Sequence, residues 1–144
     1  MELTTVLLDT HTWVWSLFQA SDLSPTAREV IEQARTVYVA PCSFHEITSR
    51  HRAGKWPEVG SVVERLPHLL RAQGGVGAPY TVEMAVLSGG MDWSHKDPFD
   101  RMIAATAIEL SCSLISRDAT FDQLESHPGW VGRVWNEIPK KKSS

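Results

Sequence analysis

The sequence predicts an α/β fold with three layers, in which helices cover both faces of a central, mostly parallel sheet. Short apolar runs, too short for buried helices, alternate along the chain with longer segments of helical periodicity. This alternation is typical of βαβ units, which build parallel sheets. The length of 144 residues corresponds to one domain. We therefore expect a single domain over residues 1–138, followed by a flexible tail over 139–144.

The first expected strand is the apolar run Val6–Leu8, which ends at Asp9. A helix follows that begins near Thr12. The next helix begins at Ser24-Pro25, because serine is a favourable N-cap and proline fits the first helical position. One face of this helix is apolar at helical spacing, with Ala27, Val30, Ile31 and Ala34.

The second expected strand is Val37–Val39, which is rich in β-branched and aromatic residues. Ser43 is expected to cap the helix that follows, and Gly54 to end it. A further helix is expected from Pro57, with Pro67 as the residue that ends or kinks it.

The second half of the chain continues the alternation. The glycine-rich stretch around Val76 predicts only a weak strand, and a short helix around Val82 and Val86 comes next. Asp97-Pro98 opens the most regular helix of the chain. The last expected elements are a strand at Cys112–Ser116, a short helix around Phe121 and Leu124, and an edge strand at Val131–Trp135.

Four acidic residues fall at equivalent places in this pattern. Asp9 and Asp118 each follow a strand, and Glu46 lies on the first turn expected for the helix after the second strand. Asp100 lies on the first turn of the Asp97-Pro98 helix. Because ligands bind beyond the carboxyl ends of the strands in open α/β sheets, these acids are expected to meet in one cleft.

Each acid also has a purely structural interpretation. The first and last of the four suit the N-caps of the helices that follow them. Ser43 and Glu46 have the S-x-x-E spacing of a capping box. If Asp97 is an N-cap, Asp100 is the third helical residue, where an acid interacts favourably with the helix dipole. No single acid is specific for a function, whereas four at one level of the sheet are moderately specific.

Four carboxylates in one cleft repel one another, which raises some of their pKa values. A hard divalent cation with oxygen ligands removes this penalty, and Mg²⁺ or Mn²⁺ suits a site made of carboxylates. Such an ion lowers the pKa of a bound water and neutralises charge at a scissile phosphate. A zinc site is not predicted, because Cys42 and Cys112 lack a second Cys or His pair at ligand spacing.

Composition narrows the class of protein further. The net charge of −3 excludes a nucleic-acid binder with a basic surface all round, but not an enzyme that reaches a polyanion through metal ions. No apolar stretch approaches the roughly 18 residues of a membrane span, so no membrane association is expected. Two cysteines and the lack of a basic leader predict a cytoplasmic protein.

Four segments in this order resemble the PIN domain in the VapC branch of bacterial toxin–antitoxin ribonucleases, and the resemblance covers about residues 5 to 125. The segments are Leu7-Leu8-Asp9-Thr10-His11, Ser43-Phe44-His45-Glu46-Ile47 with Gly54-Lys55, His95-Lys96-Asp97-Pro98-Phe99-Asp100-Arg101, and Leu114-Ile115-Ser116-Arg117-Asp118. The resemblance implies a PIN-like three-layer fold and a site at the acids Asp9, Glu46, Asp100 and Asp118.

The resemblance also implies a role for each of these residues. Asp9 is implied as the first metal ligand, and Asp100 and Asp118 as groups that bind the ion or orient its waters. Glu46 is implied to polarise the attacking water or to hold a partner ion. Two hydroxyls, those of Thr10 and Ser116, are implied to hydrogen-bond the acids. The role of Asp97 stays ambiguous, because the family segment at residues 95–101 holds two acids and only one of them aligns with the quartet.

The resemblance implies a metal-dependent endoribonuclease that leaves a 5′-phosphate and a 3′-hydroxyl, forms a homodimer and is blocked by a cognate antitoxin. One alternative is a PIN- or flap-type nuclease acting on DNA or structured ends. Another is a binding module that keeps the fold without catalysis. Trp13 and Trp15 lie on opposite faces of the first helix, which suits either core packing or a partner groove. His11 and His95 flank the quartet and are expected to be surface or capping groups.

Overall fold

The structure is a computed structural model that describes residues 4–140. Its centre is a five-stranded sheet with the strand order β3-β2-β1-β4-β5, and every neighbouring pair of strands is parallel. The strands are β1 (Thr5–Leu8), β2 (Thr36–Val39), β3 (Val76–Gly77), β4 (Ser113–Ile115) and β5 (Arg133–Val134). The predicted parallel sheet is therefore confirmed.

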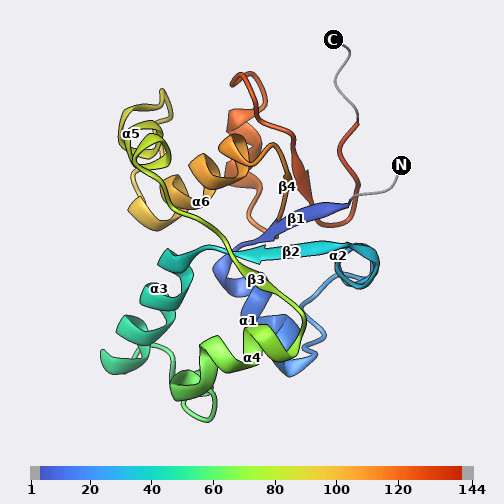
Figure 1. The fold of residues 1–144 in the computed structure, drawn as a ribbon, viewed down its shortest axis with the longest axis vertical. Helices are drawn as coiled ribbons and strands as arrows, with labels where there is room; N and C mark the ends of the chain where they lie inside the picture. Colours follow the sequence, from blue (N-terminus) through green and yellow to red (C-terminus); the bar gives the residue numbers. More distant parts are fainter. Residues whose placement is uncertain (1–3, 141–144) are drawn as a thin grey trace.

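Helices cover both faces of this sheet. Figure 1 shows α5 and α6 on one side of the strands and α1, α3 and α4 on the other. The helices are α1 (Thr10–Phe18), α2 (Pro25–Gln33), α3 (Pro41–Arg52), α4 (Leu66–Ala72), α5 (Val82–Gly90) and α6 (Pro98–Glu109), and short 3₁₀ helices lie at η1 (Pro57–Val59), η2 (Val63–Arg65) and η3 (Ala119–Leu124). The predicted three-layer α/β/α architecture is confirmed.

The central strand β1 is buried on both faces. Val6 and Leu8 belong to the apolar core shared with α1, α2, α3 and α4, whereas Leu7 belongs to the core shared with α6 and η3. These three side chains expose 0%, 2% and 0% of their surface, respectively. A strand covered by helices on both sides reads as a continuous apolar run, which is the pattern seen in the sequence.

Several expected boundaries are wrong. The helix expected from Pro57 is broken into η1, η2 and α4, and Pro67 lies in the first turn of α4 instead of ending a helix. A proline is tolerated there because the first turn leaves its N–H groups unpaired. Ser43 is not an N-cap, since α3 begins at Pro41 after Ala40, which makes no side-chain cap bond.

The two weakly patterned strands lie at the edges of the sheet and are short. The strand expected at Val131–Trp135 is reduced to the two residues of β5, and the weak strand near Val76 is present as the two residues of β3. Of the tail expected over 139–144, the residues from 141 onward lie outside the described part, and Pro139 and Lys140 have no regular structure. Within residues 4–140, no helix combines the length and the apolarity needed to cross a bilayer.

Candidate active site

Asp9 lies where β1 meets α1, and it serves this junction structurally. Its backbone N–H donates to the carbonyl of Ile115 at 3.1 Å, and its carboxylate accepts from the N–H of Thr12 at 2.9 Å as the N-cap of α1. Only 8% of Asp9 is exposed. Burial raises the pKa of this carboxyl, and hydrogen bonds from Ser116 and Thr12 oppose the increase. Capping and a place in the site are therefore compatible at this residue.

Asp97 and Asp100 lie together at the start of α6. One Asp97 carboxylate oxygen accepts from the N–H groups of Phe99 at 2.8 Å and Asp100 at 3.1 Å, so the predicted N-cap is confirmed. The Asp100 carboxylate lies 2.7 Å from Nε2 of His95. Burial raises the pKa of Asp100 to about 6, and the hydrogen bond from His95 only partly opposes this increase.

The buried Asp100 predicts a pH dependence for the metal-free protein. Its pKa rises from 3.8 to about 6 on folding, so between these values the folded protein holds a proton that the unfolded chain has released. The free energy of unfolding should therefore decrease as the pH rises through this window and level off above about pH 6. Urea denaturation across a pH series measures the slope. Asp100→Asn should make it shallower, with the remaining slope coming in part from Asp9, whose pKa burial also raises, and an unchanged slope in that variant would contradict the assignment.

Asp118 follows β4 and caps η3. Its carboxylate accepts from the N–H of Thr120 at 2.9 Å, and its own N–H donates to the hydroxyl of Ser116 at 3.0 Å. The side chain of Ser116 also hydrogen-bonds Asp9. One fully buried hydroxyl therefore contacts the side chain of Asp9 and the backbone of Asp118, and the role that the resemblance implied for Ser116 stays a prediction.

Glu46 and Thr10 differ from the sequence-based expectation. Because α3 begins at Pro41, Glu46 lies on the second turn of that helix and not on the first. Its carboxylate lies 3.4 Å from the guanidinium of Arg50. The Thr10 hydroxyl donates to the hydroxyl of Ser43 at 2.9 Å instead of to an acid. This buried bond joins α1 to α3, so Thr10 and Ser43 position the helix that carries Glu46.

The four predicted acids line one cavity of about 460 Å³ at the carboxyl ends of β1, β2 and β4, which we call the acidic cavity. The other residues of its wall are Thr10, His11, Trp15, Arg50, Asp97, Arg117 and Ala119. Within residues 4–140, no three His, Cys, Asp or Glu side chains form a group compact enough to hold a metal ion as they stand. The carboxylates therefore face a shared space and do not form a preassembled metal centre. The structure brings the acids together, and their individual catalytic roles remain predictions.

Arg101 organises the loop before α6, which is a role the sequence analysis missed. Its guanidinium donates four hydrogen bonds of 2.7 to 2.9 Å to backbone carbonyls, those of Ser88, Met91, Trp93 and His95. This loop carries His95 to the Asp100 carboxylate. The available signal was that Arg101 ends the same short run of residues that contains Asp97 and Asp100.

The two tryptophans of α1 have different environments. Trp13 is fully buried, its ring lies 4.8 Å from that of Phe44, and its indole N–H donates to Gln73 at 3.0 Å. Trp13 therefore belongs to the core, and the partner groove considered for it is wrong. Trp15 is half-buried and lines the acidic cavity.

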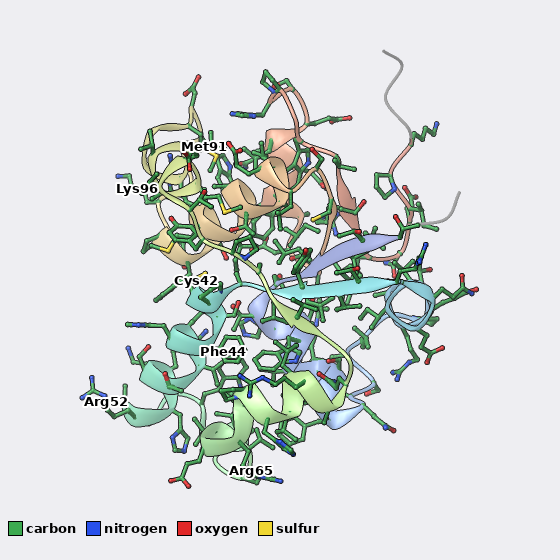
Figure 2. All side chains as sticks on the ribbon, viewed as in Figure 1. Cys42, Phe44, Arg52, Arg65, Met91 and Lys96 are labelled. Atoms are coloured by element: carbon green, nitrogen blue, oxygen red, sulfur yellow. The ribbon has the colours of Figure 1, made fainter. Side chains whose placement is uncertain are left out.

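The cysteines are unsuited to nucleophilic or metal chemistry in this state. Figure 2 shows Cys42 at the sheet end of α3, opposite the end with Arg52. Burial, together with the charges of Glu46 and Asp100, raises the pKa of the Cys42 thiol to about 12. Burial also raises the pKa of Cys112 to about 12. Both thiols are therefore protonated near neutral pH.

Comparison with known proteins agrees with this arrangement. The PIN domain family matches residues 6–126. Ribonuclease VapC22 from Mycobacterium tuberculosis is 33% identical over 129 residues, which cover 87% of this chain and 93% of the relative. The chain belongs to the VapC family of PIN-domain proteins. All four acids of this VapC-family protein lie within the matched residues.

A solved structure shows the same fold at lower sequence identity. VapBC2 from Rickettsia felis, bound to a DNA fragment from its promoter, matches with a TM-score of 0.62 at 13% identity and covers 92% of this chain and 99% of that chain. FitAB bound to an IR36 DNA fragment matches more weakly, with a TM-score of 0.48 at 19% identity over 81% of this chain and 90% of that chain.

Proposed function

We propose that this VapC-family protein is a metal-dependent endoribonuclease, the toxin of a toxin–antitoxin pair, which hydrolyses RNA phosphodiester bonds in the acidic cavity. The observation that carries the proposal is that Asp9, Glu46, Asp100 and Asp118 come from different elements and line one cavity. The relative that is 33% identical is a ribonuclease. We propose the cytoplasm as the compartment, in keeping with Cys42 and Cys112, which are both free and form no disulfide.

The donor set fits Mg²⁺ or Mn²⁺. Every acid offers only oxygen, which hard divalent cations prefer. Burial raises the pKa of Asp9 and Asp100, and a cation beside these carboxylates would offset this cost of burying their charge. Asp9, Asp100 and Asp118 would hold the ion. When bound, it supplies charge neutralisation at the phosphate and a more acidic water.

The surrounding residues keep the acids in position. Ser116 hydrogen-bonds Asp9, and His95 hydrogen-bonds Asp100, so each of these carboxylates keeps a defined orientation. Such outer partners orient metal ligands in many proteins. We propose that Glu46, which α3 brings to the cavity, orients and polarises the attacking water. Its ion-pair partner Arg50, 3.4 Å away, holds this carboxylate in position.

The proposal is tested with purified protein, RNA and single-stranded DNA of matching sequence, with Mg²⁺, with Mn²⁺ and with excess chelator. We expect RNA cleavage that depends on the ion and leaves 5′-phosphate ends. Full activity in chelator would overturn the metal mechanism. Preferential cleavage of DNA or of structured ends would support the nuclease alternative instead, and binding without cleavage would support the non-catalytic module.

The two acids at the start of α6 should behave differently on substitution. Asp97→Asn keeps the N-cap of α6, because asparagine caps as well as aspartate, and should leave cleavage nearly unchanged. Asp100→Asn removes a charge from the buried wall of the cavity and should lower both cleavage and affinity for Mn²⁺. Initial rates at several Mn²⁺ concentrations separate the two effects. Equal losses in both variants would mean that Asp97 also serves the site.

The partner of the toxin is proposed to be a cognate antitoxin, and the VapBC2 and FitAB structures are the neighbours that suggest it. A cavity lined by the four acids and Asp97 favours an inhibitor that inserts a basic residue, most simply an arginine that pairs with a carboxylate. Half-buried Trp15 then offers apolar contact beside it.

We also propose the homodimer of the family. Co-purification from the native host tests the antitoxin, the mass of the purified protein in solution tests the homodimer, and competition between Mg²⁺ and the inhibitor is expected. A chain that is harmless alone and brings down no small partner would contradict this role.

A further inference from the structure

Aromatic and cationic side chains form a stack at the border of the acidic cavity. The His11 ring stacks on Trp56 with the ring centroids 4.8 Å apart and the planes at 30°, and it lies 5.8 Å from the Trp15 ring. The guanidinium of Arg50 lies 5.2 Å from the centre of the Trp56 ring, and that of Arg117 lies 5.9 Å from the centre of the Trp15 ring. We call these five residues the aromatic stack.

Beside the stack lies a second hollow of about 410 Å³, which we call the aromatic hollow. Its wall includes His11, Trp15, Phe18, Arg50, Lys55 and Trp56. Three of these residues, His11, Trp15 and Arg50, also line the acidic cavity. The two spaces therefore adjoin each other along these three residues.

Trp15 and Trp56 pack against the apolar core on one side, but core packing covers only part of the five residues. His11 is exposed, Trp15 and Trp56 are half-buried, and the Arg50 and Arg117 side chains expose 40% and 63% of their surface. The rings come from separate elements, α1 and the segment before η1, yet they meet at the cavity. Solvent-accessible aromatic faces beside arginines are what proteins use to hold unpaired bases.

The charges of the two spaces are complementary to a nucleic acid strand. The metal-free carboxylates of the acidic cavity repel phosphate, whereas arginines attract it. Within the described part of the chain, the arginines that line this cavity are Arg50 and Arg117. A guanidinium binds phosphate in a fixed geometry and also stacks on rings. Arg50 and Arg117 each lie over a tryptophan, so they present their charge next to a flat apolar surface.

We propose that the aromatic hollow is a subsite for an unpaired nucleobase of the RNA, adjacent to the phosphate that is cleaved. The His11 and Trp56 rings already contact each other, so the base packs against the side of this ring cluster that lines the hollow, and Arg50 and Arg117 contact the phosphates on either side. This inference rests on the proposed ribonuclease function and adds to it a base-binding subsite made of residues outside the acid quartet. A base within a duplex cannot offer its face to the stack.

The test uses the full chain carrying Asp9→Asn, so that RNA is bound and not cut. The probes are a short fluorescent single-stranded RNA, the same RNA in a duplex, and a backbone of equal length without bases, each measured by anisotropy. We expect the single strand to bind about tenfold more tightly than the other two probes. His11→Ala and Trp56→Ala should each weaken the single strand by about tenfold, and Trp56→Phe should restore most of the loss.

Matched controls are available on α4. His68→Ala and Arg71→Gln change exposed residues outside both spaces and should leave affinity unchanged. His11 is exposed, so its variant keeps the fold even if Trp56→Ala does not. In the active protein, His11→Ala should raise KM more than it lowers kcat.

Two results separate this inference from the proposed function. Equal binding of the single strand, the duplex and the base-free backbone, or unchanged binding in both His11→Ala and Trp56→Ala, would overturn the base subsite and leave the ribonuclease proposal intact. No binding of any RNA by the Asp9→Asn chain, together with no cleavage by the unmodified chain, would overturn the ribonuclease proposal and the subsite with it.

Discussion

Replacing Asp9 by asparagine is expected to reduce RNA cleavage by well over the 10- to 100-fold that is typical when an outer partner of a metal ligand is lost. Asparagine has nearly the shape of aspartate and still caps α1, so the fold should persist. Because burial raises the pKa of Asp9, removal of its charge should also raise the free energy of unfolding of the metal-free protein.

The measurements are initial cleavage rates in Mg²⁺ and urea denaturation of the same preparations. Asp92→Asn is the matched control, because Asp92 is an exposed aspartate that does not line the cavity. It should retain the activity and the stability of the unmodified chain. Cleavage by Asp9→Asn at the unmodified rate would show that the acid quartet is wrongly assigned.

Replacing Arg101 by alanine is expected to give the largest loss of stability among single changes at this site, about 3 kcal/mol or more. The guanidinium donates to four backbone carbonyls, and three of these belong to the buried residues Ser88, Met91 and Trp93. A buried acceptor that loses its donor costs about 1–3 kcal/mol. Arg101→Lys should recover little, because an ammonium cannot reach four separated acceptors in the fork geometry of a guanidinium.

Urea denaturation measures this loss of stability. The control is Arg71→Ala, at an exposed position of α4, with an expected change within about 0.5 kcal/mol. Cleavage should fall as well, because the fourth carbonyl belongs to His95, whose ring holds Asp100. A loss of less than about 1 kcal/mol in Arg101→Ala would show that the loop does not depend on its guanidinium.

Local patterns predicted those parts of the fold that depend on neighbours in sequence. The buried run at β1, the Ser24 and Asp97 caps and the proline at the start of α6 all formed as expected. These features rest on β propensity, on a side chain that reaches an N–H two or three residues away, and on the fixed φ of proline. The weak patterns at Val76 and near Arg133 gave only two-residue strands, since the edge of a sheet needs less burial.

The sequence alone placed Asp9 and Asp118 after strands and Asp100 at a helix start, and parallel topology brings such positions to one edge of the sheet; Glu46 reaches the same cavity from the second turn of α3. Only the tertiary structure decided the long-range contacts: Ser43 bonds Thr10 instead of capping α3, Trp13 enters the core, and His11 stacks on Trp56. Each of these contacts joins residues more than thirty positions apart. A capping box, an amphipathic helix and a surface histidine are local signals, and they carry no information about the partner that packing of distant elements provides.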